Sequence, residues 1–494
     1  MDIDLLPAVS LDREVDALVI PVAPGPSLDP TGSEVDARLE GALSAALRDA
    51  DFSGKVGKTM VIPTLGRLPV RRVVVTGIGD GAPTADDLRR AWAVAARAAR
   101  DAGARSVVSA APPTGDLGEE RAYRAAVEGV RLGLYEFLEY RTLDRPEKRV
   151  ERFDIAGESD AARRGLAAGE AVAAAVSLAR DLVNQPADAL YPERLAAIAQ
   201  ETASAAGLEC VVHDPAALQD LGAGAILAVG KGSVREPRLI HLTYRPRGTS
   251  RGTIGLVGKA ITFDTGGVNL KPTGSGLEHM KSDMAGGAAV LATMTALAAL
   301  DVPFTVCGVI AAAENMLSGT AFRPGDVLRA MNGKTIEVIS TDAEGRLVLA
   351  DALTYTARQG AEALIDLATL TGAAIIALGQ QGTALYGTDQ ALVDDLVAAT
   401  AWSGEKLWPM PLWDEYRELI RGDVADLKNS GGRAGGSITA ALFLREFTEG
   451  KPWAHLDIAG PAWADKVSDY AGKGGTGHGV STLLAFLERR AAQG

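Results

Sequence analysis

The sequence is poor in the residues that build disulfide frameworks and common zinc sites. Among 494 residues there are only two cysteines and five scattered histidines, and no His-Glu-x-x-His pair occurs. Cys210 and Cys307 both lie in apolar stretches that are typical of buried strands. We therefore expect free thiols in a reducing compartment rather than a disulfide scaffold.

Excess positive charge and long apolar runs are also lacking. Lysine and arginine number 50 against 63 aspartates and glutamates, which gives a formal net charge of -13. This balance disfavours a general nucleic-acid binder, because such proteins need a basic surface. No apolar run approaches the roughly 18 residues of a membrane span, and the first residues do not resemble a signal peptide. We therefore expect a cytoplasmic protein that does not enter a membrane.

The length exceeds what one hydrophobic core usually holds, so we predict two domains of the α/β class. Residues 1–157 alternate strand-like and helix-like stretches, which predicts a smaller N-terminal α/β domain. A long Ala-rich helix is expected over residues 158–184, where it would connect the domains and end before Pro186. Residues 185–494 form the larger predicted domain. Its strands are expected at 225–230, 239–244, 254–257 and 305–311 and alternate with helices, which indicates a mostly parallel sheet.

An acidic stretch from Val338 to Ala352 is the strongest candidate for a functional site. Val338 and Ile339 are typical of the end of a buried strand, and a helix is expected from Leu347. Between them, Asp342, Glu344 and Arg346 are spaced so that an extended backbone would project them to one face, outside the carboxyl end of a strand. Two carboxylates this close repel each other, and a metal ion would remove the conflict. The alternative is an acidic loop that only caps the helix.

A second stretch, Gly258 to Gly287, contributes further charged side chains. It begins after the apolar run at 254–257 and leads into an Ala-rich helical pattern at 288–300. It supplies Lys259, Asp264, Lys271 and Asp283 on Gly-rich backbone that we expect to be loop-like. Hard carboxylate oxygens suit Mn²⁺ or Mg²⁺, and a nitrogen ligand shifts the preference towards Zn²⁺ or Mn²⁺.

Together the two stretches resemble the M17 leucyl aminopeptidases, which remove N-terminal residues from peptides with two metal ions. The signature of that family is Asn-Thr-Asp-Ala-Glu-Gly-Arg-Leu, and only its first position departs here, at Ser340. Further matching segments lie near residues 180–186, 314–319, 368–373, 426–433, 453–460 and 475–480, with Leu317 where the family usually has proline. The resemblance covers about residues 180–490 and implies a smaller, macro-like N-terminal domain before a catalytic di-metal peptidase domain.

The resemblance implies a site of two divalent ions, Mn²⁺ or Zn²⁺, and a role for each matching residue. One metal would be held by Asp264, Asp342 and Glu344. The other would be held by Lys259, Asp264, Asp283 and Glu344, with Asp264 and Glu344 bridging. Lys271 would stabilise the oxyanion, and Arg346 would hold a bicarbonate that acts as the general base. The pocket for the first side chain would be lined by Met280, Thr369, Leu370 and Gly372.

The implied reaction is hydrolysis of the N-terminal peptide bond by a water that bridges the two metals, with a preference for leucine and other apolar first residues. The implied partners are peptides with a free N-terminus, and the implied assembly is a homohexamer. Two alternatives stay open at this point. One is another two-metal hydrolase, such as a phosphoesterase. The other is a non-enzymatic DNA-binding regulator, a role known for some relatives, against which the acidic balance argues.

Overall fold

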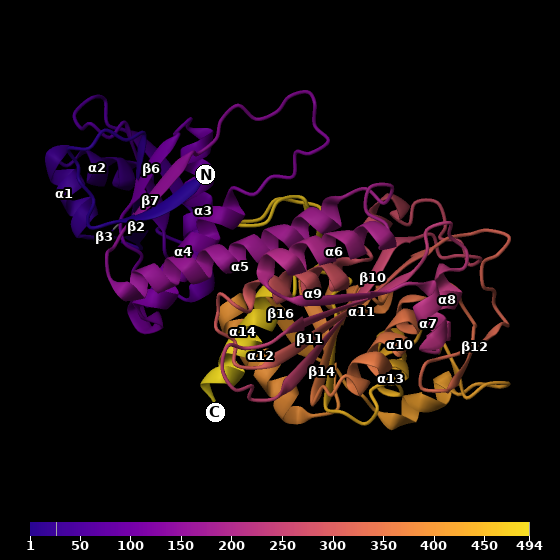
Figure 1. The fold of residues 1–494 in the computed structure, drawn as a ribbon. Helices are drawn as coiled ribbons and strands as arrows, with labels where there is room; N and C mark the ends of the chain where they lie inside the picture. Colours follow the sequence, from indigo (N-terminus) through magenta and orange to yellow (C-terminus); the bar gives the residue numbers. More distant parts are fainter. Residues whose placement is uncertain (26, 494) are drawn as a thin grey trace. The chain divides into compact units, whose positions relative to one another are not determined.

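The structure, a computed structural model, describes residues 1–25 and 27–493, and both of its compact units are of the predicted α/β class (Figure 1). The first unit comprises Met1–Ala174 with two short later segments, Ala401–Gly404 and Lys466–Gly472. The second unit is the rest of the described chain. The division at residues 157 and 184 that the sequence suggests stays a prediction.

The first unit is built on a seven-stranded sheet of order β1-β7-β6-β2-β5-β4, with β3 paired to β2. The strands β1, β7, β6, β2 and β5 are parallel, and β4 is antiparallel to β5. The strands are β1 Asp2–Leu6, β2 Ala17–Ala23, β3 Ser27–Leu28, β4 Thr59–Pro63, β5 Arg72–Gly77, β6 Ser106–Ser109 and β7 Arg152–Ala156. The helices between them are α1 Pro30–Arg38, α2 Ala42–Asp49, α3 Ala85–Asp101 and α4 Glu119–Gly133.

Charge is buried between α3 and α4 in what we call the arginine cluster: Arg89, Arg124 and Glu128. Nε of Arg89 lies 2.8 Å from one oxygen of Glu128, and Nε of Arg124 lies 2.9 Å from the other. Arg89 also donates to the carbonyl oxygens of Trp402 and Ser403. Arginine has no acceptor and five donors, so a shared carboxylate and backbone carbonyls are the partners it needs when it is buried.

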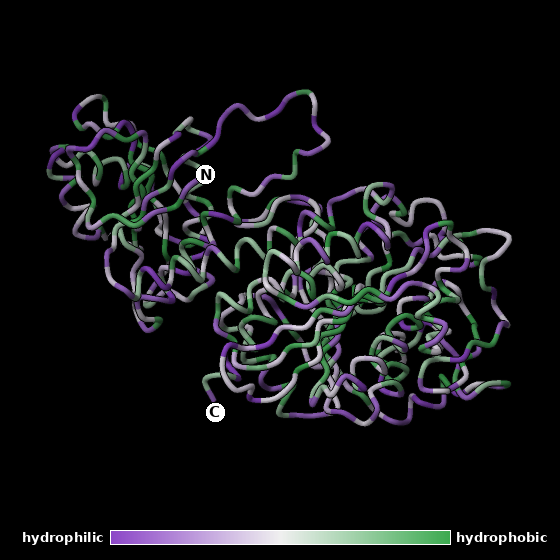
Figure 2. The backbone as a smooth tube through the Cα atoms, in the orientation of Figure 1, coloured by the Kyte–Doolittle hydropathy of each residue, from purple (hydrophilic) through white to green (hydrophobic). Residues whose placement is uncertain are grey.

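The second unit is built on an eight-stranded sheet of order β16-β15-β18-β14-β10-β11-β9-β8. The four central strands β18, β14, β10 and β11 are parallel, as predicted, and antiparallel pairings begin at β9 and β15. The strands are β8 Glu209–His213, β9 Arg238–Tyr244, β10 Thr253–Asp264, β11 Thr305–Asn315, β14 Ala363–Ala368, β15 Gly382–Gly387, β16 Lys406–Pro409 and β18 Trp453–Asp457. In Figure 2 the tube along the central strands is coloured mainly as hydrophobic residues, and the side chains of these strands are buried.

Helices cover both faces of this sheet, so the central strands need no polar face. One layer contains α8 Gly224–Gly230, α10 Gly345–Arg358 and α13 Gly436–Arg445, which share one core with the sheet. The other contains α6 Pro192–Ala206, α9 Ala285–Ala296 and α14 Val480–Ala492, which contact one another through α9. The remaining helices are α7 Pro215–Asp220, α11 Gly372–Leu378 and α12 Gln390–Ser403.

Three predictions of local structure were wrong. Residues 225–230 form helix α8 instead of a strand, because the carboxylate of Asp351 accepts from the backbone N–H groups of Ala225 and Ile226 at the helix start. Val338 and Ile339 do not end a strand of the large sheet. They follow β13 Thr335–Glu337, which belongs to a small sheet with β12 Val327–Arg329 and β17 Leu427–Lys428.

The third wrong prediction is the loop-like backbone expected around Lys259 and Asp264. Strand β10 runs on to Asp264, well past the predicted end at 257, so Lys259 and Asp264 sit on a strand rather than a loop. The long helix expected between the domains is present as α5 Asp160–Asn184. None of the helices seen in the described residues has the length and apolar character that a bilayer crossing requires.

Candidate active site

A cavity of about 620 Å³ opens in the second unit, and every residue predicted for the site lines it. The predicted residues in its wall are Lys259, Asp264, Lys271, Met280, Asp283, Asp342, Glu344, Arg346, Thr369, Leu370 and Gly372. Of the two departures from the family pattern, Ser340 also lines this cavity, whereas Leu317 is exposed and does not. The structure therefore brings the two predicted stretches to one place.

Strand β10 positions Lys259 and Asp264. The side chain of Lys259 lies on the face of the sheet that α10 covers, and a Cβ on Gly345, the first residue of α10, would come within 2.5 Å of its Nζ. Asp264 ends the strand, and its Oδ1 accepts from the N–H of Gly266 and from Nδ2 of Asn315. Glycine at 345 thus makes room for the lysine, and the end of β10 fixes the aspartate.

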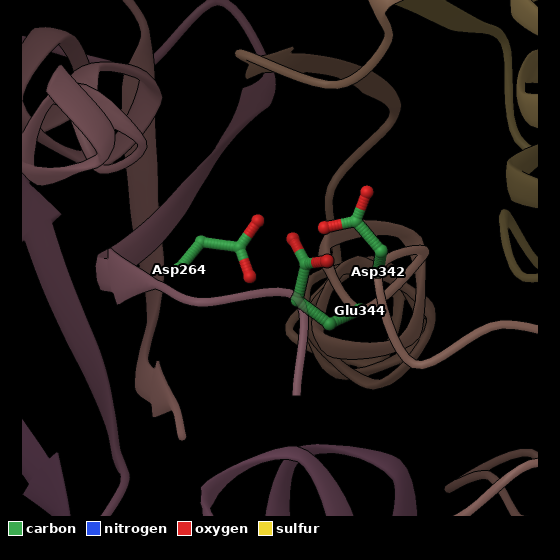
Figure 3. Close-up of side chains that lie close together, drawn as sticks. All are labelled: Asp264, Asp342 and Glu344. Carbon is green, nitrogen blue, oxygen red and sulfur yellow. The ribbon is translucent and has the colours of Figure 1, made fainter. Parts of the chain in front are cut away.

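The carboxylates of Asp264, Asp342 and Glu344 point toward one another from two different segments (Figure 3). One oxygen from each lies within 4.8 Å of the others, which is the spacing of a group that could hold a metal ion. Glu344 occupies the N-cap position of α10 but makes no side-chain capping hydrogen bond. The carboxylate of Glu344 therefore lines the cavity and does not cap the helix.

Asp283 joins this group through a lysine rather than directly. Nζ of Lys259 lies 2.9 Å from Oδ1 of Asp283 and 3.0 Å from Oε1 of Glu344, and it donates to the carbonyl oxygen of Thr369. Nζ of Lys271 lies 2.8 Å from Asp264 and 2.6 Å from Asp342. We call the four acids, Asp264, Asp283, Asp342 and Glu344, the acidic cluster.

The electrostatics of the acidic cluster show more negative charge than its surroundings neutralise. Burial, reinforced by the charge of Glu344, raises the pKa of Asp264 to about 6. Burial also raises the pKa of Asp283 to about 8, against the opposing charge of Lys259. The pKa of Lys271 is raised as well, because the charges of Asp264, Glu344 and Asp342 outweigh the effect of burial. Two lysines balance only two of the four carboxylates, so the others hold a proton, as the raised pKa values of Asp264 and Asp283 indicate, until a cation binds.

Two buried oxygens of the acidic cluster have no hydrogen-bond partner among the described residues: Oδ2 of Asp283 and Oε2 of Glu344. A buried carboxylate oxygen without a donor is costly, and such atoms mark places where a ligand completes the structure. Each belongs to a residue predicted to bind metal, and the chemistry of the donors is that of Mn²⁺ or Zn²⁺ sites. The residues present therefore fit a divalent metal centre.

Arg346 differs from both lysines because it has no acidic partner at ion-pair distance within the described part of the chain. It is nearly buried, its Nη1 donates to the carbonyl oxygen of Asn429 at 2.9 Å, and its Nε is unsatisfied. Burial lowers its pKa to about 10. A guanidinium with unused donors at a cavity wall can bind a small planar anion.

Two buried asparagines that the sequence analysis did not identify fix the backbone of the site. The Oδ1 of Asn429 accepts from the N–H groups of Ile339 and Ser340, and its Nδ2 donates to the carbonyl oxygens of Ser340 and Ala343. Nδ2 of Asn315 donates to Asp264 and to the carbonyl oxygen of Thr341. Nothing in their spacing reveals these contacts. The sequence signal for each asparagine was its place inside a segment that resembles the family, 314–319 or 426–433.

Another part of the cavity wall is apolar. Leu370, Ile375 and Ile376 line it together with Met280. Its backbone is held by Asp457 at the end of β18, which accepts from the N–H of Leu370 and from the hydroxyl of Thr371. The arrangement offers an acidic end for a cation and an apolar surface for a side chain.

Comparisons with known proteins agree with this geometry. The model described as "Cytosol aminopeptidase family, catalytic domain" matches residues 177–484, and the one described as "Cytosol aminopeptidase family, N-terminal domain" matches residues 19–143. A probable cytosol aminopeptidase of Geobacter sp. (strain M21) is 45% identical over 462 residues, which cover 92% of this chain and 94% of that protein. A second, from Roseiflexus castenholzii, is 46% identical over 456 residues, which cover 91% and 93%.

Solved structures are similar along almost the whole chain. The bottromycin maturation enzyme BotP, in complex with Mn, superposes with a TM-score of 0.87 at 38% identity, covering 97% of this chain and 100% of that one. A mutant of tomato leucine aminopeptidase superposes with a TM-score of 0.88 at 36% identity, covering 99% and 96%.

Proposed function

The chain belongs to the cytosol aminopeptidase family and is a metallopeptidase of the leucyl aminopeptidase type, and we propose that it removes leucine and other apolar N-terminal residues with two divalent cations. The observation that carries the two-cation proposal is the acidic cluster. Its four carboxylates line one cavity, and two of their buried oxygens lack any described partner.

The cations would be Mn²⁺ or Zn²⁺, and a related enzyme has been solved in complex with Mn. Asp264, Asp342 and Glu344 would hold one, and the other would be held by Lys259, Asp264, Asp283 and Glu344. When bound, such a pair supplies Lewis acidity and a water of lowered pKa. Asn315 keeps the side chain of Asp264 in place, and Asn429 holds the backbone of the loop that carries Asp342.

Lys271 and Arg346 are the residues to which we assign chemistry. Lys271 lies between Asp264 and Asp342 and keeps its proton, so it can donate to the oxyanion that develops when the peptide carbonyl is attacked. Arg346 is buried with an unused Nε, and we assign it a bicarbonate that accepts a proton as general base.

Substrate choice follows from the two ends of the cavity. The free ammonium of a peptide is attracted to the acidic cluster, which explains removal of the first residue only. Its side chain would lie against Met280, Thr369, Leu370 and Gly372. An apolar wall gains about 0.8 kcal/mol for each buried methylene, which favours leucine and methionine over small or charged residues.

The assembly and the location are also proposals. We propose a homohexamer and a cytosolic location; relatives carry the name cytosol aminopeptidase. Mass photometry on the purified chain would test the hexamer, and a monomer at micromolar concentration would contradict it.

The central test is hydrolysis of Leu-Gly, Met-Gly, Arg-Gly and Cys-Gly by the purified protein before and after chelation. We expect activity to disappear in excess chelator and to return with Mn²⁺ or Zn²⁺, with Leu and Met substrates cleaved fastest. Full activity after exhaustive chelation and dialysis would refute the two-cation proposal. Phosphate release from a phosphoester instead of amino-acid release would refute the peptidase assignment.

A further inference from the structure

Four positively charged side chains line the catalytic cavity, and one of them has no role in the function proposed above. Lys259 and Lys271 are each bound to two carboxylates, and Arg346 is nearly buried beside them. The fourth, Arg433, is exposed and forms no ion pair with any residue that the structure describes. An arginine that lines a substrate cavity without an acidic partner has its full set of donors free for a ligand.

The backbone holds Arg433 near the catalytic loop. Arg433 lies only four positions after Asn429, so their Cα atoms are at most about 14 Å apart. Asn429 is fully buried and fastened to residues 339–343, which carry Asp342. After Arg433, the N–H of Gly436 donates back to the carbonyl oxygen of Arg433, and helix α13 begins. The arginine is therefore carried by a short turn anchored on both sides.

We propose that Arg433 binds a carboxylate on the leaving side of the peptide substrate and so makes the enzyme prefer short peptides with a negative charge beyond the scissile bond. This inference rests on the aminopeptidase function proposed above. The preferred substrate would be a dipeptide with a free C-terminus or a peptide with an acidic second residue, because both offer the same chemical group.

Charge complementarity sets the direction in which the peptide lies. The acidic cluster, in which three of the four carboxylates are buried, attracts the N-terminal ammonium, whereas Arg433 is exposed. The chain beyond the scissile bond must lead from the buried end toward solvent, since only its first residue is removed. A short zwitterionic peptide then presents its positive end to the acidic cluster and its negative end to the exposed arginine.

The planar guanidinium offers two parallel N–H groups to a carboxylate, which lysine cannot do. A charge-assisted contact in a half-open cavity is expected to be stronger than an exposed ion pair and weaker than a buried one. We therefore expect the contact to contribute about fivefold to tenfold in substrate affinity.

The test compares Leu-Gly with Leu-Gly-amide, which lacks the terminal carboxylate, and Leu-Asp-amide with Leu-Asn-amide, which differ only in the side-chain charge. Steady-state rates are measured for the metal-loaded wild type and for Arg433→Gln and Arg433→Lys. Arg358→Gln is the matched control, because Arg358 is exposed in the last turn of α10 and does not line the cavity. Arg433 is exposed, so its variants should fold normally.

For Arg433→Gln we expect KM for Leu-Gly to rise about fivefold to tenfold while kcat changes less than twofold, with no change for Leu-Gly-amide. Arg433→Lys should recover part of the loss, and Arg358→Gln should match the wild type. A loss confined to Leu-Gly assigns the C-terminal carboxylate, and a loss confined to Leu-Asp-amide assigns the acidic second residue. Equal effects on all four substrates, or none, would overturn the proposal.

A binding measurement separates this proposal from the proposed function. Calorimetric titration of chelator-treated protein with Leu-Gly and Leu-Gly-amide needs no turnover. If no peptide is cleaved but the wild type still binds Leu-Gly more tightly than its amide, and Arg433→Gln does not, the carboxylate site stands and the peptidase function fails. If peptides are cleaved but the two ligands bind alike, Arg433 has no such role.

Discussion

In the first unit, the arginine cluster buries two guanidinium groups around one carboxylate, whereas the acidic cluster of the second unit gathers four carboxylates around two lysines. Three of those four carboxylates, on Asp264, Asp283 and Glu344, are buried. Most side chains of both clusters are buried, and both clusters contain contacts near 2.9 Å. The two clusters differ in whether all of their carboxylate oxygens have hydrogen-bond partners. Both oxygens of Glu128 are occupied, and Arg89 also reaches backbone carbonyls. In the acidic cluster, two buried oxygens lack a described partner and a cavity lies alongside.

This difference separates a charge cluster that stabilises the fold from one that serves a ligand. A buried ion pair is neutral or weakly favourable when every donor and acceptor is matched, and removing one partner is strongly destabilising. A cluster with surplus charge of one sign opposes folding and persists where binding needs it. Mutations in the two clusters should therefore affect stability and activity in opposite ways.

The largest contrast is expected between Asp264→Asn and Glu128→Gln. Asp264→Asn should lower kcat/KM about 10³-fold, because it removes a proposed ligand shared by both cations. It should leave the thermal midpoint of the metal-free protein unchanged or raise it, since repulsion within the acidic cluster is reduced. Glu128→Gln should leave two buried guanidinium groups without a counter-charge and cost about 3 kcal/mol, or about 10 °C.

Differential scanning calorimetry of both chelated variants, with Leu-Gly assays of the metal-loaded forms, measures this contrast. If Asp264→Asn lowers the thermal midpoint as much as Glu128→Gln does, the two clusters are alike and the distinction drawn here is wrong.

The next effect sharpens the comparison inside the acidic cluster itself. Lys259→Arg should lose one of two metals and most activity, because guanidinium has no lone pair and Gly345 leaves no room for a larger group. Lys271→Arg should keep both metals and lose mainly turnover, since charge is retained with the wrong geometry. Elemental analysis of folded, dialysed variants measures the stoichiometry. Two metals retained in Lys259→Arg would show that this lysine is not a ligand.

A smaller loss is expected for Arg346→Ala. The variant should bind both metals, because arginine cannot ligate a cation, and should turn over about 10²-fold more slowly. Added bicarbonate should stimulate the wild type after degassing but not the variant. A fall in metal content would instead place Arg346 among the residues that support the metal site.

The smallest effect concerns a buried pair in the second unit, His455 and Asp366. Burial alone would lower the pKa of His455, but the charge of Asp366, whose Oδ1 lies 2.6 Å from Nδ1, outweighs it and raises the pKa. The pair therefore stabilises the fold fully below about pH 6.5, the ordinary histidine value, and the contribution is lost as pH rises through the raised pKa.

A pKa of His455 raised by one pH unit corresponds to about 1.4 kcal/mol of folding free energy at low pH. His455→Gln should therefore be less stable than the wild type at pH 6, with a difference that shrinks toward pH 9. Thermal midpoints of metal-free protein measured across this range give the slope. Parallel curves for the two proteins would show that the pair does not titrate in this window.

Sequence reasoning succeeded where a property is local and failed where a distant residue decides. The alternation of apolar strands and Ala-rich helices was sufficient to predict both α/β units, and helix α10 begins within two residues of its expected start. Residues 225–230 were misread because a short apolar run fits a strand or a helix, and the deciding contact comes from Asp351, far along the chain. The end of β10 was placed too early because glycine at 258 suggested a loop.

The candidate site was predictable for the same reason, since Asp342, Glu344 and Arg346 lie within five residues of one another. That Lys259 faces them could be taken only from the family resemblance, because it depends on how β10 packs against α10. The asparagines were missed since an amide that binds backbone leaves no periodic pattern. Arg433 was part of a noted motif, but its freedom from acidic partners is visible only in three dimensions.

The hydrogen bonds of Asn429 also limit when the loop of residues 339–343 can take its shape during synthesis. The loop of residues 339–343 acquires its shape from a side chain about 90 positions later, so closing it is a long-range event that local folding cannot replace. A growing chain that has not yet reached residue 429 lacks the side chain that holds the loop carrying Asp342. The hydrogen bonds that shape this side of the cavity can therefore form only after the C-terminal part of the second unit has been synthesised.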